Sequence, residues 1–185
     1  MSTKFELKAP VFLVAVPQLV DENFNRSVIL LLDYNDEGAM GVVINRATEL
    51  DLVEFCSSQD MEYRSTRRGY VHSGGPVQRD RAFLIHHSDH VGPETEAISG
   101  NTRLSYSLES LRMVSESPPE WLRVFLGYAG WGPGQLGEEI TSGAWLVTEF
   151  KDDILFDTEV GDVWETCLKE MGIEPIQLIH SGEVH

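Results

Sequence analysis

Three histidines and a carboxylate gather within five residues of this chain, at 86–90, which read His-His-Ser-Asp-His. Imidazole and carboxylate groups suit zinc or nickel, so this cluster could ligate a metal ion. However, the apolar residues that precede it predict a strand, and neighbouring strand residues point to opposite faces. His86 and His87 would then face apart, and a polar loop at the end of a strand explains the same residues. We therefore predict no metal and no other cofactor.

A glycine-rich pattern at residues 132–137 matches G-x-G-x-x-G, the loop that places a pyrophosphate at a helix N-terminus. Pro133 removes an N–H donor from this loop, and Glu138 and Glu139 add negative charge directly after it. A complete second βα unit is not visible beyond it. These features favour a tight connection from a strand to a helix over dinucleotide binding.

Motifs for catalysis are otherwise missing from the sequence. It contains neither the G-x-x-x-x-G-K-[ST] phosphate loop nor the G-x-S-x-G nucleophile elbow, so no catalytic residue is predicted. One enzymatic alternative stays open, a small hydrolase that uses His72 or His86 with a nearby carboxylate as an acid–base pair. Cys56 and Cys167 lie among apolar residues and are predicted to be buried structural thiols.

The charge of the chain limits its partners. Its 185 residues carry 14 basic and 30 acidic side chains, a formal net charge of −16. Nucleic-acid affinity depends largely on Lys and Arg, so direct DNA binding is a third, disfavoured alternative. One island has the opposite sign: five arginines and a single acid lie between residues 64 and 81, at Arg64, Arg67, Arg68, Arg79, Asp80 and Arg81. This island is either an anion or partner site, or a solvated loop whose arginines pair with carboxylates.

A length of 185 residues suits one domain or two small ones, and 42% hydrophobic residues provide material for a core. No apolar run approaches the roughly 20 residues that span a bilayer, so we expect no membrane insertion. The first residues lack the basic flank and apolar core of a signal peptide, and the two cysteines form no C-x-x-C pair. We therefore expect a cytoplasmic protein.

The spacing of apolar residues predicts the strands and helices that must position the candidate functional side chains. Turn residues at 35–38 make residues 27–45 a predicted hairpin, and Ser107 is a predicted helix cap. A loop is expected over 89–103, with a short strand near 97–98, and a glycine-rich turn over 129–134. Strands are predicted at 11–16, 27–33, 40–45, 82–86, 123–128 and 144–149, and helices at 50–58, 108–115, 134–141 and 160–171. Without a regular βαβ order, this mixture predicts an α+β fold with a largely antiparallel sheet.

The segment 127–136 holds four glycines and two large aromatic residues, which suits either a special core turn or a recognition surface. We hypothesise that the turn at 74–76, with its neighbouring arginines, lies beside this segment and forms one binding patch with it. The residues of this predicted patch are Gly74, Gly75, Pro76, Arg79, Arg81, Tyr128, Trp131 and Gln135.

Four separated motifs resemble the YqgE/AlgH family of bacterial proteins, in order and over nearly the whole chain. They are Pro17-Gln18-Leu19 with Asp21, Phe24 and Ser27-Val28, Gly38 to Asn45, Gly74-Gly75-Pro76-Val77 with Arg81, and Gly127 to Trp131 with Gly134-Gln135-Leu136, Glu139 and Trp145-Leu146. Leu155-Phe156 and Trp164 continue the match. The resemblance implies a single domain over residues 1–185, with a bent antiparallel sheet that forms a pseudo-barrel and helices outside it.

About function the resemblance implies little, because the family offers no established catalytic residues to transfer. One branch is named for an effect on alginate production and is described as a transcriptional regulator. We therefore expect a non-enzymatic regulatory or binding protein that acts through a protein or a small ligand.

Overall fold

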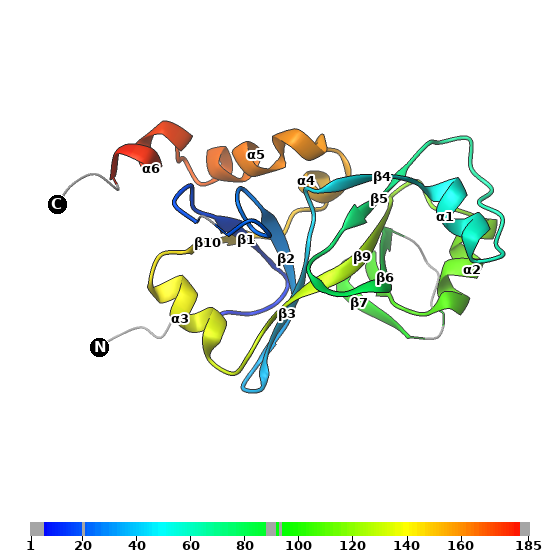
Figure 1. Ribbon diagram of the computed structural model, residues 1–185, viewed down its shortest axis with the longest axis horizontal. Coiled ribbons are helices and arrows are strands. Elements are labelled where there is room, and N and C mark those ends of the chain that lie inside the picture. Colours follow the sequence, from blue (N-terminus) through cyan, green and yellow to red (C-terminus); the bar gives the residue numbers. More distant parts are fainter. Residues whose placement is uncertain (1–5, 20, 88–91, 93, 182–185) are drawn as a thin grey trace.

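The computed structural model describes residues 6–19, 21–87, 92 and 94–181 (Figure 1). Its strands are β1 (Val11–Ala15), β2 (Val28–Asn35), β3 (Gly38–Val43), β4 (Ala47–Asp51), β5 (Tyr70–Ser73), β6 (Val77–His87), β7 (Thr95–Ser99), β8 (Thr102–Ser105), β9 (Leu122–Trp131) and β10 (Trp145–Glu149). Its helices are α1 (Leu52–Ser58), α2 (Leu108–Glu116), α3 (Gln135–Thr141), α4 (Asp152–Phe156), α5 (Val163–Glu170) and α6 (Pro175–Ser181), with a 3-10 turn at Val160–Asp162.

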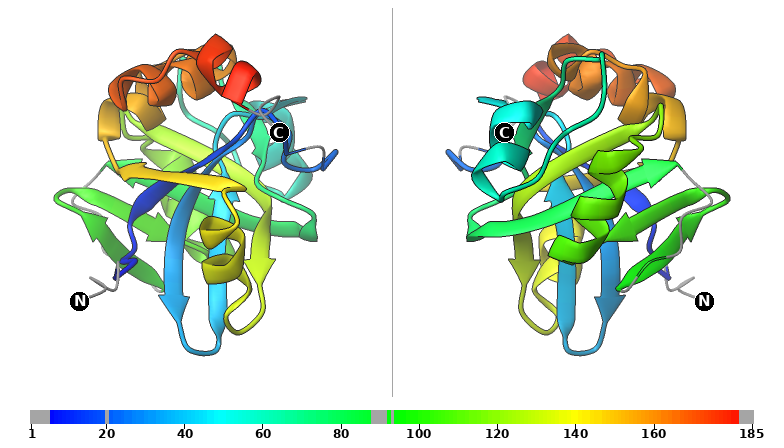
Figure 2. Two further views of the ribbon diagram at one scale, coloured as in Figure 1. Left: turned by 90° about the vertical axis from the view of Figure 1, so that its left-hand side faces the viewer. Right: turned by 90° about the vertical axis from the view of Figure 1, so that its right-hand side faces the viewer.

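The strands form one curled sheet, and its main path runs in the order β10-β1-β2-β3-β9-β6-β8-β7. All neighbours on this path are antiparallel, whereas β5 pairs in parallel with β9 and antiparallel with β4. Along one edge of β9, β3 pairs at residues 129–131 and β5 at residues 125–126. The sheet curls into a half-barrel with helices outside it (Figure 2), so the predicted α+β fold with a bent, largely antiparallel sheet is confirmed.

Apolar side chains from both ends of this path fill the inside of the curl. Phe12 and Leu30 from β1 and β2 belong to the same buried cluster as Phe83 and Phe125 from β6 and β9. α4 and α5 contribute to this cluster, and the Trp164 indole N–H donates to the Ala15 carbonyl over 2.8 Å. The helices α4 to α6 therefore cover one end of the half-barrel, while the β2–β3 hairpin projects from the other (Figure 2).

Helices cover the outer faces of the sheet with two further apolar clusters. Leu136 of α3 packs in a cluster with side chains of β1, β2, β3, β9 and β10. Phe55 of α1 and Leu111 of α2 pack in another with side chains of β5, β6 and β9. Burial of each large apolar side chain contributes about 1.5–3 kcal/mol, which fixes both ends of β9 against its neighbours.

Several predicted elements are confirmed, and the predicted hairpin corresponds to β2 and β3. The Ser107 hydroxyl caps α2 by accepting from the Ser110 N–H over 3.0 Å. Gly172 follows α5 with a φ of 70°, as expected for the residue that ends a helix. Within the described residues no helix is both long and apolar enough to cross a bilayer.

Other predictions are wrong. β9 continues through Ala129-Gly130-Trp131, where the sequence predicted the start of a turn, and it pairs there with β3. The short strand predicted near 97–98 is confirmed as part of β7, but the rest of the later half of the predicted loop over 89–103 also belongs to the β7–β8 hairpin. The strand β4 and the helices α4 and α6 were not predicted, because each is short and has no clear apolar periodicity.

Candidate functional site

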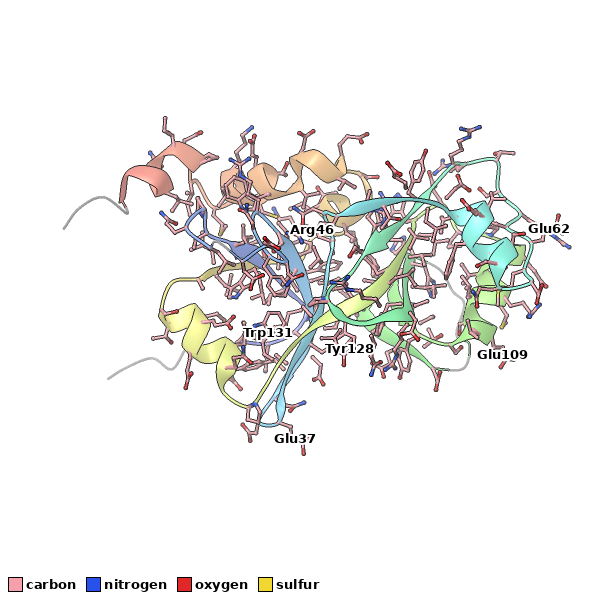
Figure 3. The ribbon with its side chains drawn as sticks, viewed as in Figure 1. Glu37, Arg46, Glu62, Glu109, Tyr128 and Trp131 are labelled. Atoms are coloured by element: carbon pink, nitrogen blue, oxygen red, sulfur yellow. The ribbon has the colours of Figure 1, made fainter. Side chains whose placement is uncertain are left out.

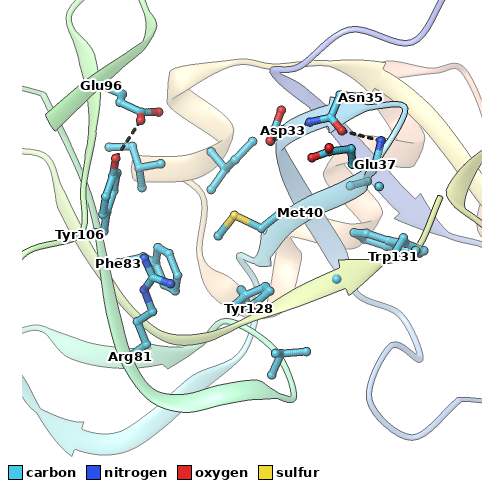
Figure 4. A pocket seen from close by; sticks show the side chains of 17 residues that line it. Asp33, Asn35, Glu37, Met40, Arg81, Phe83, Glu96, Tyr106, Tyr128 and Trp131 are labelled. Atoms are coloured by element: carbon cyan, nitrogen blue, oxygen red, sulfur yellow. Dashed lines mark hydrogen bonds between the residues drawn. The ribbon is translucent and has the colours of Figure 1, made fainter. Parts of the chain in front are cut away.

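A large hollow lies beside the β2–β3 hairpin, at the end of the half-barrel away from α5 (Figure 2). We call it the barrel pocket; its volume is about 840 Å³. Figure 3 places Glu37 at the hairpin and Tyr128 and Trp131 on β9, and Figure 4 shows the pocket from close by. The side chains that line the barrel pocket include those of Asp33, Asn35, Glu37, Met40, Arg81, Phe83, Glu96, Tyr106, Tyr128 and Trp131.

One wall of the barrel pocket combines aromatic rings with a guanidinium group. The Arg81 Cζ lies 5.2 Å from the ring centroid of Phe83 and 5.8 Å from that of Tyr106, which is cation–π distance. Phe83 also contacts Tyr128 edge to face, with the ring centroids 5.9 Å apart. Within the described residues no carboxylate lies within 4.0 Å of the Arg81 guanidinium, which donates to the Gln78 amide oxygen over 3.5 Å.

Carboxylates surround the rest of the barrel pocket. The Tyr106 hydroxyl donates to Glu96 over 2.8 Å, and this hydrogen bond raises the pKa of Tyr106. Across the pocket, Asp33 accepts from the Asn35 amide over 3.2 Å, and Glu37 lies two residues further along the hairpin. In Figure 4, Asp33 and Glu37 lie on the hairpin side, Arg81 on the opposite side, and Met40 between them. The pocket thus has separated charges with an apolar floor.

Trp131 is held at the edge of the barrel pocket by a carboxylate on α3. One oxygen of Glu139 accepts from the indole N–H of Trp131 over 2.9 Å and from that of Trp145 over 2.8 Å. The other oxygen accepts from the Gln135 amide over 3.1 Å. Trp131 is only 8% exposed, so these bonds satisfy a donor that water reaches poorly.

The turn at 74–76 meets the middle of β9 backbone to backbone. The Gly74 N–H donates to the Leu126 carbonyl over 2.8 Å, and the Gly74 carbonyl accepts from the Val43 N–H over 2.8 Å. A Cβ on Gly75 would lie 2.2 Å from the carbonyl carbon of Tyr128, and Gly75 has a φ of 151°. Only glycine permits this approach. We call this contact the glycine junction.

The residues of the predicted patch lie in four different environments in the structure. Arg81, Tyr128 and Trp131 line the barrel pocket, and Gly74 is buried in the glycine junction. Gly75, Pro76 and Arg79 line a small hollow of about 30 Å³ together with Arg46. Gln135 is exposed on α3, where its amide oxygen accepts from the Gly132 N–H over 3.0 Å.

The arginine island is divided in the same way. β6 and β9 lose register between Val77 and Ala82, so Arg79 and Arg81 lie in an irregular stretch of β6. Arg64 is exposed and pairs with Glu62 at 3.3 Å. Arg67 and Arg68 line a different pocket of about 240 Å³ together with Arg123. We call it the arginine pocket.

The two histidines of the hydrolase alternative are buried and line neither of these pockets. Burial, with a smaller effect of the nearby Arg123 charge, lowers the pKa of His72 to about 4. The His86 Nε2 lies 2.8 Å from the Ser105 hydroxyl, which is itself fully buried. Such inaccessible groups offer a substrate no approach.

The histidine cluster gives no metal site in the described residues, where no group of three or more potential ligands is placed to hold an ion. Residues 88–90 lie outside the described part of the chain. His87 instead packs against Trp121, with ring centroids 5.0 Å apart. Cys56 and Cys167 are both buried, as expected, and burial raises the pKa of Cys167 to about 12.

Several lining residues of the barrel pocket were not singled out from the sequence. Asp33, Met40, Glu96 and Tyr106 come from the β2–β3 and β7–β8 hairpins, which meet Arg81 only through the curl of the sheet. In the sequence, the turn residues at 35–38 gave an indication of this part of the pocket, because they predicted a hairpin of apolar strands with polar residues at its tip.

Comparisons with known proteins agree with this architecture. A family model described as AlgH-like matches residues 12–176. A UPF0301 protein of Myxococcus xanthus is 40% identical over 172 residues, covering 92% of this chain and 94% of that protein. The solution structure of the AlgH protein from Pseudomonas aeruginosa superposes with a TM-score of 0.74 at 31% identity, covering 97% of this chain and 99% of that one. The crystal structure of protein DIP2367 from Corynebacterium diphtheriae, with a TM-score of 0.70, 22% identity and coverage of 94% and 90%, shares the fold.

Proposed function

The chain belongs to the AlgH-like family, and we propose from its geometry that it is a non-enzymatic, ligand-binding regulatory protein. The ligand occupies the barrel pocket. Its class is a small zwitterion with an apolar body, such as a short peptide. Occupancy would then alter contact with a protein partner, and any control of transcription would pass through that partner.

The separation of charge in the barrel pocket carries this proposal. Arg81 lies on one side, where the Glu96 carboxylate is held by the Tyr106 hydroxyl, and the carboxylates of Asp33 and Glu37 lie on the other, with Met40 between (Figure 4). An anionic group at Arg81 and a cationic group at the hairpin would each meet opposite charge. A volume of about 840 Å³ is within the usual range of about 300–1,000 Å³ for small-molecule sites.

The chemistry of the lining favours binding over catalysis. Among the described residues that line the barrel pocket there is no histidine, cysteine, serine, threonine or lysine, so no nucleophile–base pair of the Ser–His or Cys–His type can form there, and its acid–base groups are carboxylates and tyrosines. Direct DNA binding gains no support either, because the five arginines of the island lie in separate surroundings rather than along one basic surface. Two buried free thiols suit the cytoplasm, where we place this function.

Calorimetric titration with the dipeptides Lys-Phe and Arg-Tyr tests the proposal. We expect at least one to bind the wild type, and its N-acetylated, C-amidated form, in which both backbone charges are removed, to bind at least tenfold more weakly. Arg81→Gln and Asp33→Asn should each weaken binding of the free dipeptide by about tenfold, the usual effect of removing one hydrogen-bonded charge.

Arg64→Gln is the matched control, because Arg64 belongs to the same arginine island but is exposed and lies outside the barrel pocket. Its affinity for the dipeptides should equal that of the wild type. Two results would overturn the proposal: neither dipeptide binds at millimolar concentration, or Arg81→Gln and Arg64→Gln bind with the same affinity.

A further inference from the structure

We propose that the arginine pocket is an anion site for a phosphate group, either free phosphate or a small phosphomonoester. This inference rests on a different part of the molecule from the barrel pocket and stands independently of the proposed function. The arginine pocket lies where the loop before β5 meets the start of β9 and the end of α4, at the α1 side of the sheet (Figure 1).

Three guanidinium groups line this pocket in a chain that has only 14 basic residues against 30 acidic ones. Arg67 and Arg68 come from the loop before β5, and Arg123 is the second residue of β9. Guanidinium donors match phosphate oxygens in pairs, so converging arginines are the usual way that proteins hold this group. Tyr63 and Ser65 add hydroxyl groups to the same lining.

Arg123 is the arginine whose position in this pocket is fixed by the protein backbone. Its guanidinium donates to the carbonyl of Phe156 over 2.6 Å and to that of Leu122 over 3.2 Å, which fixes its position. The group is half-buried, and burial lowers the pKa of Arg123. Within the described residues no carboxylate lies within 4.0 Å of it, so a partly desolvated cation lacks a close counter-charge.

The other two arginines differ in how far they are already engaged. Arg67 pairs with Glu120 at 3.1 Å, which holds it at the exposed side of the pocket. Arg68 is exposed and has neither a hydrogen bond nor an ion pair in the described part of the chain. The Arg68 side chain can therefore turn towards a phosphate group that is bound to Arg123.

Two carboxylates in the lining set a limit on the ligand. Glu120 pairs with Arg67, and Asp157, together with Glu159 outside the lining, attracts Arg123 from beyond ion-pair distance. Among the lining residues one net positive charge remains, which suits a single phosphate group rather than a polyphosphate. The volume of about 240 Å³ also leaves room for a phosphate and a short substituent only.

The test is calorimetric titration of the full chain at low ionic strength with sodium phosphate and, separately, with glycerol 2-phosphate. Sodium chloride at matched ionic strength is the reference. We expect saturable binding of at least one of the two phosphates, with the tighter one identifying whether the site prefers the free ion or the ester. Arg68→Gln should weaken this binding at least tenfold, and Arg123→Gln should weaken it further.

Arg64→Gln again provides the control, since it removes an exposed arginine from the same loop outside the pocket. It should leave phosphate affinity unchanged. Because Arg123→Gln could also disturb folding, the decisive comparison is Arg68→Gln with Arg64→Gln. The proposal fails if neither phosphate binds more than chloride does at millimolar concentration, or if these two variants lose the same affinity.

Discussion

The two ends of strand β9 contribute to two pockets with opposite character. Its start, at Leu122 and Arg123, lines the arginine pocket, whereas its end, at Tyr128, Gly130 and Trp131, lines the barrel pocket. The arginine pocket holds three guanidinium groups and two carboxylates; the barrel pocket holds one guanidinium group and three carboxylates. The same strand thus supports a site that favours anions and another in which charges of both signs face each other.

The difference shows that local composition, not net charge, decides what each surface can bind. A chain with a charge of −16 still concentrates arginine where the loop before β5 crosses the start of β9. Long-range repulsion is screened within about 10 Å at moderate salt, so a nearby guanidinium outweighs distant carboxylates. Substitutions can distinguish the two ends of β9, and the one with the largest expected effect should impair binding in both pockets.

Substitution of Gly75 by alanine should have the largest effect, because the glycine junction holds the middle of β9. The new Cβ would lie 2.2 Å from the Tyr128 carbonyl carbon, so the backbone must move. We expect the free energy of unfolding, measured by urea denaturation, to fall by about 3 kcal/mol or more. Phosphate and dipeptide binding should weaken together.

Gly161→Ala is the matched control for that variant. Gly161 is exposed, does not have a positive φ, and a Cβ there would have nothing within 4 Å. Its stability should stay within about 0.5 kcal/mol of the wild type. If Gly75→Ala is equally mild, the glycine junction does not hold β9 in place.

Acid should affect the His72 side of β9, where this histidine packs on Phe125 with ring centroids 5.4 Å apart. The folded-state pKa of about 4 lies below the ordinary value of 6.5, so the unfolded chain binds the proton first. Stability linked to His72 is therefore complete above about pH 6.5 and is lost as the pH falls towards 4. The shift corresponds to a loss of about 3 kcal/mol at most.

The measurement is urea denaturation of the wild type and His72→Gln at several pH values between 7.5 and 4. Glutamine does not titrate, so the variant should lose less stability than the wild type over this range. Parallel curves for the two proteins would rule out a contribution from His72. Comparing them removes the effects of other titrating groups that both proteins share.

Much of the fold was predictable because apolar, β-branched runs mark the central strands directly. β1, β2, β3 and the start of β9 are buried segments of this type. The end of β9 was predicted as a turn over 129–134 because Gly130, Gly132 and Gly134 lie close together there. In the folded chain β9 continues past Gly127, which allows close contact with the turn at 74–76, and this is a tertiary reason that local propensity does not contain.

The candidate sites were predictable only in part, for the same reason. Motif spacing singled out Arg81, Tyr128 and Trp131, which do line one pocket. It could not bring Glu96 and Tyr106 to them, because that depends on the curl that carries β7 and β8 round to face β2. Motif spacing also could not assign Arg67 and Arg68 to the arginine pocket. The best-fixed guanidinium of that pocket is Arg123, which lies more than fifty residues away from them in sequence.

Removal of the Glu139 carboxylate should have the smallest effect and the most selective one, because it supports only the barrel-pocket end of β9. Glu139→Ala leaves the indole N–H groups of Trp131 and Trp145 without their acceptor, which we expect to lower the free energy of unfolding by about 2 kcal/mol. Glu139→Gln keeps an acceptor oxygen and should lose about half as much. Trp131 borders the barrel pocket, so dipeptide affinity should fall while phosphate affinity stays unchanged.

The matched control for this change is Glu138→Ala, one residue earlier on α3, where the side chain is exposed and has no hydrogen bond within the described residues. Urea denaturation and both titrations should give wild-type values for it. If Glu139→Ala also leaves dipeptide binding intact, then the position of Trp131 does not matter for the barrel pocket. If it weakens phosphate binding as strongly as dipeptide binding, the two ends of β9 are coupled through the strand and do not act as separate sites.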